Sequence, residues 1–556
     1  MNNNNFYGQN PPPNYQNPPP NPGYSNGQFP NPNQYMPQQQ YQQPSNQQHP
    51  ELNYHPEAQH QNTLNNSQQK YDSDPQYPPE PNPQIPIDSS EYFTGKIAKE
   101  SKFRDWWAAV LFLLNFALFV FLAVLFIPST PSISHSTDTS TNIFSEKSFI
   151  EMVISMTITI ILSLLYMFLV HNFTKGIITV SFWTLAAIIG GLGVYYIIKK
   201  VYIAGGILLF FFVLYAKSWF GLKHAIPFTE AVLKSVLKII RKFPSTIIVS
   251  LIFAIIVSAF NTAWYLTLTG SQFYMKKYET CTTKTISSGT SKQQCSNTSL
   301  TLTYIYLGFI YFWAIQVIVN VLHTTVCGLF ATYYFYEGAS EGYPTDTPLL
   351  SSLKRASIYS FGSICFGSLI VAILQIFRAI VEMFRFNNTK HIVLTILNIF
   401  TDYILGFIQG FIEYFNKYAY IEIAIYGKPF IKASKDTLRL LTSKGLMAVV
   451  NDCLTGNVFF MGSIIVSLFR NLLNQFVSTR ILNSAVGNGG HGALLGFVGF
   501  VFGVSVFTTI NGIIGSGSST AFVCLAEDER AVARSDPDMY AIVNEKYPDV
   551  ISGISR

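Results

Sequence analysis

Long runs of uncharged, apolar residues recur along this chain and constrain its fold more than any other feature. The first run reads WWAAVLFLLNFALFVFLAVLF over residues 106–126 and carries no charged side chain. About 20 consecutive apolar residues cross a bilayer as an α-helix. Only 12% of the chain is charged, against about 25% in a typical soluble domain. The sequence therefore predicts an all-α, polytopic membrane protein.

Ten such runs are predicted to span the membrane, and an even number of spans places both termini on one side. The run at 392–414 is the most polar, since it contains Asp402, Gln409 and Glu413, and a re-entrant or surface helix is its alternative. The predicted spans are 105–127, 150–170, 176–198, 201–221, 245–268, 302–326, 357–380, 392–414, 446–469 and 491–514.

Loop charge predicts the orientation of these spans. The two most basic loops, 222–244 and 415–445, fall on the same side as the N-terminus. Basic loops are retained in the cytosol, so both termini are expected there. The opening residues lack the basic and apolar regions of a signal peptide. We interpret the net charge of +6 as this loop bias, and expect no nucleic-acid partner.

The N-terminal segment 1–95 differs sharply from the rest. It is rich in Asn, Gln, Pro and Tyr, and residues 1–50 contain no Asp, Glu, Lys or Arg. Such a composition buries too little apolar surface to fold, which predicts a disordered cytosolic tail. Either a solvated or a self-associating tail fits this composition. We therefore divide the chain into this tail, a transmembrane domain at 96–526 and a cytosolic C-terminal tail at 527–556.

The outward loop 269–301 carries two signs of an oxidising compartment. Cys281 and Cys295 flank a Ser/Thr-rich stretch and are candidates for a disulfide. Asn297 begins the glycosylation sequon Asn-Thr-Ser. The other cysteines lack metal-ligand spacing and are interpreted as small packing residues: Cys327, Cys365, Cys453 and Cys524.

Motifs of soluble enzymes are missing from the sequence. It has no HExxH, P-loop, GxSxG or GxGxxG, and the histidines are scattered without helical ligand spacing. We expect no metal, no cofactor and no enzymatic activity, and a membrane-bound enzyme of lipid metabolism is disfavoured for the same reason.

Polar residues at membrane depth are better indicators of function, because burying them is costly. In the fifth span, Asn261 precedes Trp264 and Tyr265, and in the sixth Trp313 precedes Gln316 and Asn320. Polar groups beside aromatic rings suit a small organic cation, so these six residues are the candidate substrate site. Interfacial or packing roles for the two tryptophans are the alternative. Further polar candidates are Asn115, Gln375, Arg378, Glu382, Asp402, Gln409 and Glu413.

Glycines at the end of the tenth span offer a second hypothesis. The stretch NGIIGSGSS over 511–519 predicts an interrupted helix that serves as a gate. Close helix packing is the alternative use of small residues in a membrane.

The stretch NKYAYIEIAIYGKPF at 416–430 lies between two long apolar runs. It is too short to cross a bilayer alone, and Gly427 and Pro429 end it. We expect it to continue the preceding helix or to lie at the interface, with Ile and Tyr packed under the bundle. Lys417, Lys428 and Lys432 would then face the cytosol.

These residues resemble a known family. The segment 418–430 is similar to the AYIxIAIYGxxF signature of choline transporter-like proteins, and the match continues to Leu441 with a departure at Ala433-Ser434. Asp105-Trp106 resembles the family's opening helix, and 522–528, FVCLAED, its closing segment. The resemblance covers about residues 96–550, and the polar tail resembles the fungal, pH nine-sensitive branch.

The resemblance implies transport of choline or a related organic cation across the plasma membrane, with the substrate and membrane lipid as partners. The signature is expected to act as a gate or structural element, with Tyr418, Glu422, Tyr426 and Gly427 as its main residues. A non-transporting membrane organiser that acts through the disordered tail is the alternative from a different class.

Overall fold

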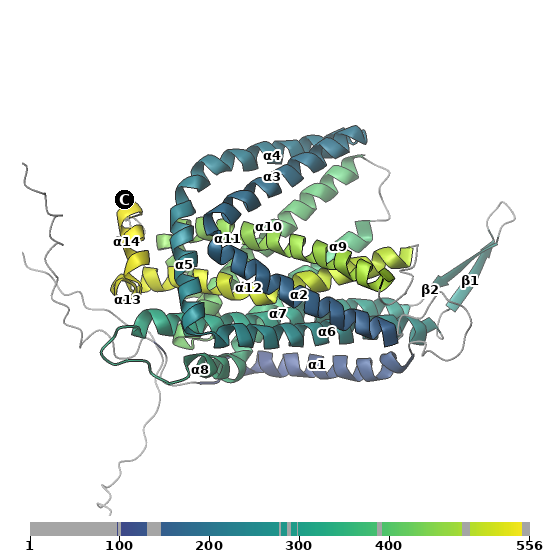
Figure 1. Ribbon diagram of the computed structural model, residues 1–556. Coiled ribbons are helices and arrows are strands. Elements are labelled where there is room, and N and C mark those ends of the chain that lie inside the picture. Colours follow the sequence, from purple (N-terminus) through teal and green to yellow (C-terminus); the bar gives the residue numbers. More distant parts are fainter. Residues whose placement is uncertain are drawn as a thin grey trace, which may run out of the picture. The chain divides into compact units, whose positions relative to one another are not determined.

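The computed structural model describes Ile97 and residues 102–129, 146–276, 280–285, 291–296, 298–385, 392–480 and 490–547. Within these ranges the chain is helical apart from one hairpin, as predicted for an all-α protein. The longer helices run side by side as a bundle (Figure 1). The α-helices are α1 (Trp106–Phe126), α2 (Glu146–Asn172), α3 (Thr174–Ile198), α4 (Tyr202–Leu222), α5 (Ile226–Lys242), α6 (Ser245–Lys276), α7 (Thr298–Tyr336), α8 (Pro348–Lys354), α9 (Phe361–Arg385), α10 (Ile392–Tyr426), α11 (Phe430–Arg480), α12 (Gly490–Glu527), α13 (Glu529–Ser535) and α14 (Pro537–Lys546).

Nine helical segments of the described chain are long and apolar enough to cross a membrane, so the chain is a multi-pass membrane protein. They overlap nine of the predicted spans. The predicted span 392–414 is not among them, although α10 forms there as a continuous helix of 35 residues. The side chains of residues 392–399 lie outside the described residues, so a membrane span at 392–414 stays a prediction.

Helix α7 lies at the centre of the bundle and contacts α6, α9, α10 and α12. Its residues 321–336 are all buried. A helix that is buried on every side needs apolar or internally bonded side chains throughout, which its sequence supplies. The elements around α7 therefore determine where a site inside the bundle can form.

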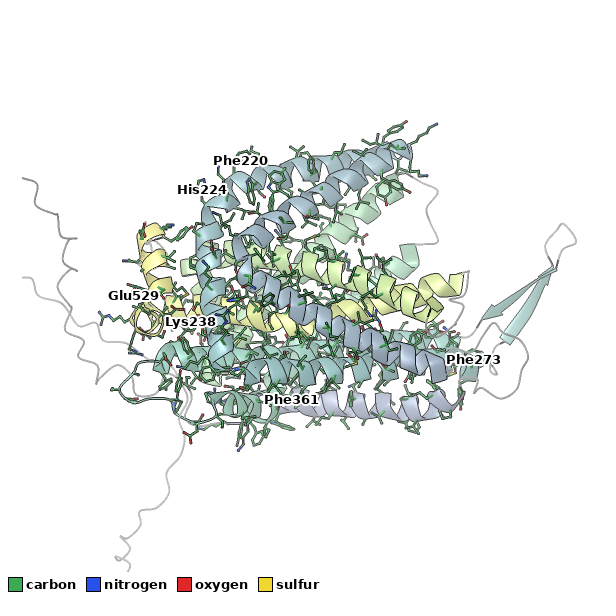
Figure 2. All side chains as sticks on the ribbon, viewed as in Figure 1. Phe220, His224, Lys238, Phe273, Phe361 and Glu529 are labelled. Atoms are coloured by element: carbon green, nitrogen blue, oxygen red, sulfur yellow. The ribbon has the colours of Figure 1, made fainter. Side chains whose placement is uncertain are left out.

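The two ends of the bundle differ. At one end the amphipathic helix α5 runs across the long helices and buries Phe228, Val232 and Ile239. Helices α13 and α14 pack at the same end, where Lys238 and Glu529 lie, whereas Phe273 lies at the opposite end (Figure 2). We refer to these as the α13 end and the hairpin end.

The hairpin consists of β1 (Thr280–Thr285) and β2 (Ser291–Ser296), which pair antiparallel. The register places Cys281 directly opposite Cys295. Opposed residues in an antiparallel pair have Cα atoms about 4.5–5.5 Å apart, within disulfide range. The disulfide itself stays a prediction, and Asn297 lies outside the described residues.

Helix α12 is continuous, so the predicted interruption at 511–519 is wrong. A Cβ atom on Gly517 would lie 2.6 Å from the ring of Phe330 and 2.9 Å from Val236. This glycine therefore permits close packing of α12 against α7 and α5, the alternative use of small residues.

Candidate functional site

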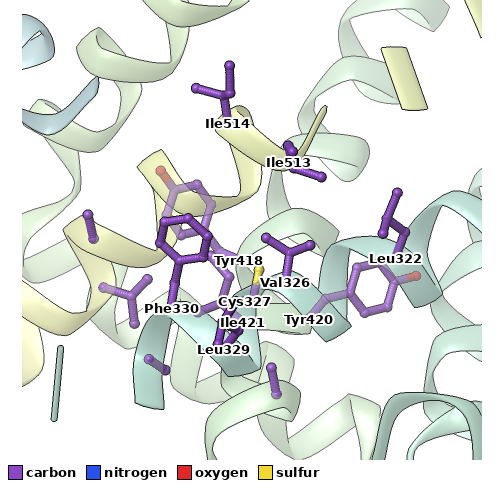
Figure 3. Close-up of a cluster of buried hydrophobic side chains, with 14 of the residues drawn as sticks. Leu322, Val326, Cys327, Leu329, Phe330, Tyr418, Tyr420, Ile421, Ile513 and Ile514 are labelled. Carbon is purple, nitrogen blue, oxygen red and sulfur yellow. The ribbon is translucent and has the colours of Figure 1, made fainter. Parts of the chain in front are cut away.

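The signature segment forms the last turns of α10 and is embedded in the bundle. Residues 418–425 are all buried, and their side chains meet those of α7 and α12 (Figure 3). The helix ends at Gly427, whose φ of 59° lies in the left-handed region that favours glycine. Continuation of the preceding helix is therefore confirmed.

Glu422 is 2% exposed and accepts a hydrogen bond from Lys428 Nζ at 2.9 Å. The same ammonium lies 2.8 Å from Asp436 Oδ2 in α11. Burial lowers the pKa of Lys428, but hydrogen bonds to Asp436 and Glu422 outweigh it and raise that pKa. Hydrogen bonding from Lys428 lowers the pKa of Asp436. Lys428 thus links the end of α10 to the start of α11.

A second ionic group ties α10 to two other helices. Asp452 of α11 accepts hydrogen bonds from Lys417 Nζ at 3.1 Å, Tyr418 Oη at 2.8 Å and Ser519 Oγ at 3.2 Å. Lys417 and Lys428 both form ion pairs and stay 30% and 22% exposed, so their predicted orientation toward the cytosol stays a prediction. Lys432 is exposed, as expected.

His323 of α7 extends this second group. Its Nε2 lies 3.0 Å from the carbonyl oxygen of Lys417, and its Nδ1 lies 2.7 Å from Ser516 Oγ in α12. A carbonyl only accepts hydrogen bonds, so Nε2 carries the proton in a neutral ring. His323 thereby connects α7, α10 and α12 through polar contacts inside an apolar bundle.

The segments that resemble the family's opening and closing motifs also converge on the signature. Asp105 Oδ2 accepts hydrogen bonds from Phe430 N at 2.8 Å and Ser363 Oγ at 2.6 Å, and Arg104 Nε donates to the Gly427 carbonyl at 3.2 Å. In the closing segment, Glu527 accepts a hydrogen bond from Tyr426 Oη at 3.0 Å. Three motifs far apart in sequence form one contact region at the α13 end.

The structure separates the six candidate substrate residues into distinct places. Asn261 is fully buried in α6, and its amide has no hydrogen-bond partner among the described residues. One turn later, the Trp264 ring lies 4.5 Å from Tyr311 of α7, and its Nε1 donates to the Leu307 carbonyl at 2.8 Å. Tyr265 follows on α6 and is half-buried.

Trp313 occupies a different face of α7. It is fully buried, its ring packs against Phe112 of α1 at 5.3 Å, and its Nε1 donates to the Cys365 carbonyl at 3.1 Å. These contacts are those of a packing residue with its one donor satisfied.

Gln316 and Asn320 point toward the signature. Asn320 Nδ2 donates to Gln316 Oε1 at 3.4 Å and to Ser368 Oγ of α9 at 3.0 Å. Ser368 Oγ lies 3.4 Å from Tyr420 Oη. A chain of neutral polar groups therefore joins α7, α9 and α10.

A further polar cluster joins α9 to α10. Gln375 and Gln409 both donate to Glu413 Oε1, at 3.2 and 2.8 Å, and Arg378 Nη1 donates to Gln409 Oε1 at 3.4 Å. In these contacts the polar groups of α9 and α10 satisfy one another's hydrogen bonds, as polar groups do when they lie at membrane depth.

Asp452 and His323 were missed as functional candidates in the sequence. Asp452 lies inside the predicted span 446–469, so the criterion of polarity at membrane depth identifies it. His323 lacks a ligand-spaced partner, and only the fold reveals its neighbours. Among the described residues no cluster of His, Cys, Asp and Glu is arranged to hold a metal ion.

Comparison with known proteins supports the resemblance seen in the sequence. The profile of the family described as "Plasma-membrane choline transporter" matches residues 206–530, which include the signature, Asp452 and the closing segment. This chain belongs to the choline transporter-like family. Proteins named Protein PNS1 are 30% identical in Debaryomyces hansenii, over 88% of this chain and 94% of that one, and 30% identical in Saccharomyces cerevisiae, over 85% and 88%.

A third Protein PNS1, from Cryptococcus neoformans var. neoformans serotype D, is 32% identical over 71% of each chain. These relatives place this choline transporter-like protein in the fungal, pH nine-sensitive branch, as its sequence predicts. Its membership supports a transporter-type role in a membrane for a small-molecule substrate.

Proposed function

We propose that this protein transports choline or a related small organic cation across the plasma membrane by facilitated diffusion. The observation that carries the proposal is an aromatic group beside an unsatisfied amide at membrane depth. Tyr311 packs between Phe260, at 6.1 Å, and Trp264, at 4.5 Å, and Asn261 lies three residues before Trp264, on the same side of α6. Aromatic faces attract quaternary ammonium groups, which donate no strong hydrogen bonds.

Asn261 adds the polar part of such a site. A buried amide without a partner costs about 1–3 kcal/mol, so its retention favours a ligand or water that bonds to it. Choline carries a hydroxyl group two carbons from its trimethylammonium group. The amide could bond to the hydroxyl group, and the indole ring one helical turn away could contact the ammonium group. Residues 245–275 of α6 include no charged side chain that would compete with choline for these groups.

The signature supplies the gate in this proposal. Tyr418–Asp452, Tyr426–Glu527 and Lys428–Asp436 join α10 to α11 and α12, which holds the α13 end closed. We assign this end to the cytosol because it carries the basic loops. Alternating access requires these contacts to separate as a group when the site opens there.

Membrane potential is sufficient to drive uptake of a cation. A monovalent cation that crosses about 100 mV, negative inside, gains about 2.3 kcal/mol. At about 1.4 kcal/mol per tenfold change, this gain supports about fifty-fold accumulation. Uniport therefore suffices without a coupled ion.

Ligand-dependent thermal stabilisation of the purified protein tests the site. Choline should raise the unfolding temperature more than ethanolamine or an uncharged alcohol, and Trp264→Ala and Asn261→Ala should abolish the shift. Trp106→Ala, at an exposed position of α1, is the matched control. Stabilisation by choline that survives Trp264→Ala would contradict this placement of the site.

The alternative organiser function predicts a different result. Deletion of residues 1–95 should leave choline-dependent stabilisation and flux unchanged if the transmembrane domain is a transporter. If the protein binds no amine and its cellular phenotype is lost with the tail, the organiser function is favoured instead.

A further inference from the structure

A cavity at the α13 end lies outside the proposed transport site. It is lined by α7, by the segment from α8 to the start of α9, and by the end of α10 with the turn that follows it. The residues that matter here are Lys102, Thr324, Ser352, Arg355, Ser360 and Gly427. With Tyr359, two cations and four hydroxyl-bearing side chains thus share one cavity, and no described lining residue is acidic.

Arg355 is the unusual member of this group. Its Nη2 donates a long hydrogen bond of 3.3 Å to Ser352 Oγ, while its buried Nε has no partner. No described carboxylate forms an ion pair with it. Burial lowers the pKa of Arg355, yet a guanidinium remains protonated in proteins. Arg355 therefore has a positive charge without a described counter-charge, and a donor that is not used.

Local backbone geometry places this guanidinium over the cavity. Residues 355–359 form a π-helical turn between α8 and α9, a feature that often marks functional sites. A Cβ atom on Gly328 of α7 would lie 2.7 Å from Ser352 Oγ and 3.3 Å from Arg355 Nη2. Glycine at 328 therefore leaves the space that both side chains occupy.

The surroundings of the cavity are those of a bilayer surface. Large apolar side chains are exposed where α1 and α8 begin and within the π-helical turn: Phe103, Trp106, Leu350 and Ile358. Aromatic residues of this kind concentrate at the membrane–water interface, the depth of lipid phosphates. Arginine with nearby hydroxyls is the side-chain set that binds phosphoryl oxygens.

We propose that Arg355 and Lys102, with the hydroxyls of Ser352 and Ser360, form a binding site for a phosphoryl group. An anionic lipid headgroup and a free phosphate present the same chemistry to these residues. Gly427 also lines the cavity, and its carbonyl accepts the hydrogen bond from Arg104. The bound group would therefore lie against the turn that ends the signature helix.

Binding to the full-length protein in detergent tests this proposal without any measurement of transport. Three probes are titrated while the unfolding temperature is followed: dioctanoyl phosphatidic acid, dioctanoylglycerol with the same chains but no phosphoryl group, and inorganic phosphate. We expect phosphatidic acid to stabilise the protein and dioctanoylglycerol to have no effect. Equal stabilisation by phosphate alone would identify a free anion as the ligand, and stabilisation by the lipid only would identify a headgroup.

Variants locate the site. Arg355→Gln should weaken phosphatidic acid binding at least tenfold, and Lys102→Gln should weaken it severalfold. Lys354→Gln removes the same charge from the neighbouring exposed residue outside the cavity, and should change binding less than twofold. If Arg355→Gln does not fold, phosphatidic acid binding is measured with Ser352→Ala and Lys102→Gln instead. Unchanged binding in these variants, equal loss in Lys354→Gln, or no stabilisation by either phosphoryl probe would overturn the proposal.

Discussion

The carboxylate of Asp105 accepts a hydrogen bond from the backbone amide of Phe430, 325 residues further along the chain, at 2.8 Å. Phe430 begins α11, and the first amides of a helix lack intrahelical partners. The side chain that precedes the first membrane helix thus caps a helix near the end of the domain. The negative charge also lies at the positive end of the α11 dipole.

Removal of this cap should destabilise the protein. Asp105→Ala should lower the free energy of unfolding by about 1–2 kcal/mol, and Asp105→Asn by less, because an amide oxygen still accepts the bond. Thermal unfolding in detergent measures the difference. Asp346→Asn, at an exposed loop position, is the control and should change little. Equal stability of Asp105→Ala and the wild type would show that the contact is not stabilising.

The Lys417–Asp452 pair should behave as a partly buried ion pair. Asp452→Asn should cost about 2–3 kcal/mol, somewhat below the 3–5 kcal/mol of a fully buried pair. We expect this smaller loss of stability because the Lys417 side chain is 30% exposed and water solvates part of its charge. Combining Asp452→Asn with Lys417→Met should recover part of this loss, since the unpaired ammonium is then removed. Strictly additive losses would argue against coupling between the two residues.

Glu337 should make stability depend on acidic pH. Burial raises its pKa, but hydrogen bonds from Lys242, at 2.5 Å, and from Tyr343 outweigh this and lower it. A carboxyl whose pKa is lower in the folded state stabilises the protein above its unfolded pKa, about 4.3. That contribution is lost as the pH falls from about 5 through the folded pKa.

The matched variant isolates this contribution. Glu337→Gln should lower the unfolding temperature at pH 7 and reduce its decline between pH 5 and lower values, whereas Glu341→Gln, an exposed neighbour, should follow the wild type. A parallel pH dependence in Glu337→Gln and the wild type would exclude Glu337 as the titrating group.

The hairpin register predicts a disulfide between Cys281 and Cys295 in protein from an oxidising compartment. Maleimide labelling of the unfolded protein should detect two additional thiols per chain after reduction. Cys281→Ser and Cys295→Ser should each expose the other thiol without reduction. Two reactive thiols at these positions before reduction would contradict the pairing.

Hydropathy was sufficient to predict most of the fold, because each span is specified by its own length of apolar sequence. The signature, Asp105-Trp106 and the closing segment were also recognised locally. Their convergence was not, since the Asp105–Phe430 contact depends on how four helices pack. The ion pair of Lys417 was not predicted for the same reason, because its partner Asp452 lies in another helix.

The candidate substrate residues show a related limit of sequence reasoning. Spacing places Trp313, Gln316 and Asn320 near one face of α7, and Asn261 and Trp264 one turn apart on α6. Sequence alone does not show which neighbouring helix each of these faces contacts. In the structure Trp264 meets Tyr311, while Trp313 meets α1 and α9.

Labelled choline uptake into proteoliposomes, driven by a potassium diffusion potential that is negative inside, tests the central claim most directly. The wild type should accumulate choline about fifty-fold at about 100 mV, Trp264→Phe should retain part of the flux, and Trp264→Ala should lose at least tenfold. Trp106→Ala should match the wild type. A correctly folded protein that shows no voltage-dependent choline flux would contradict transport of this cation.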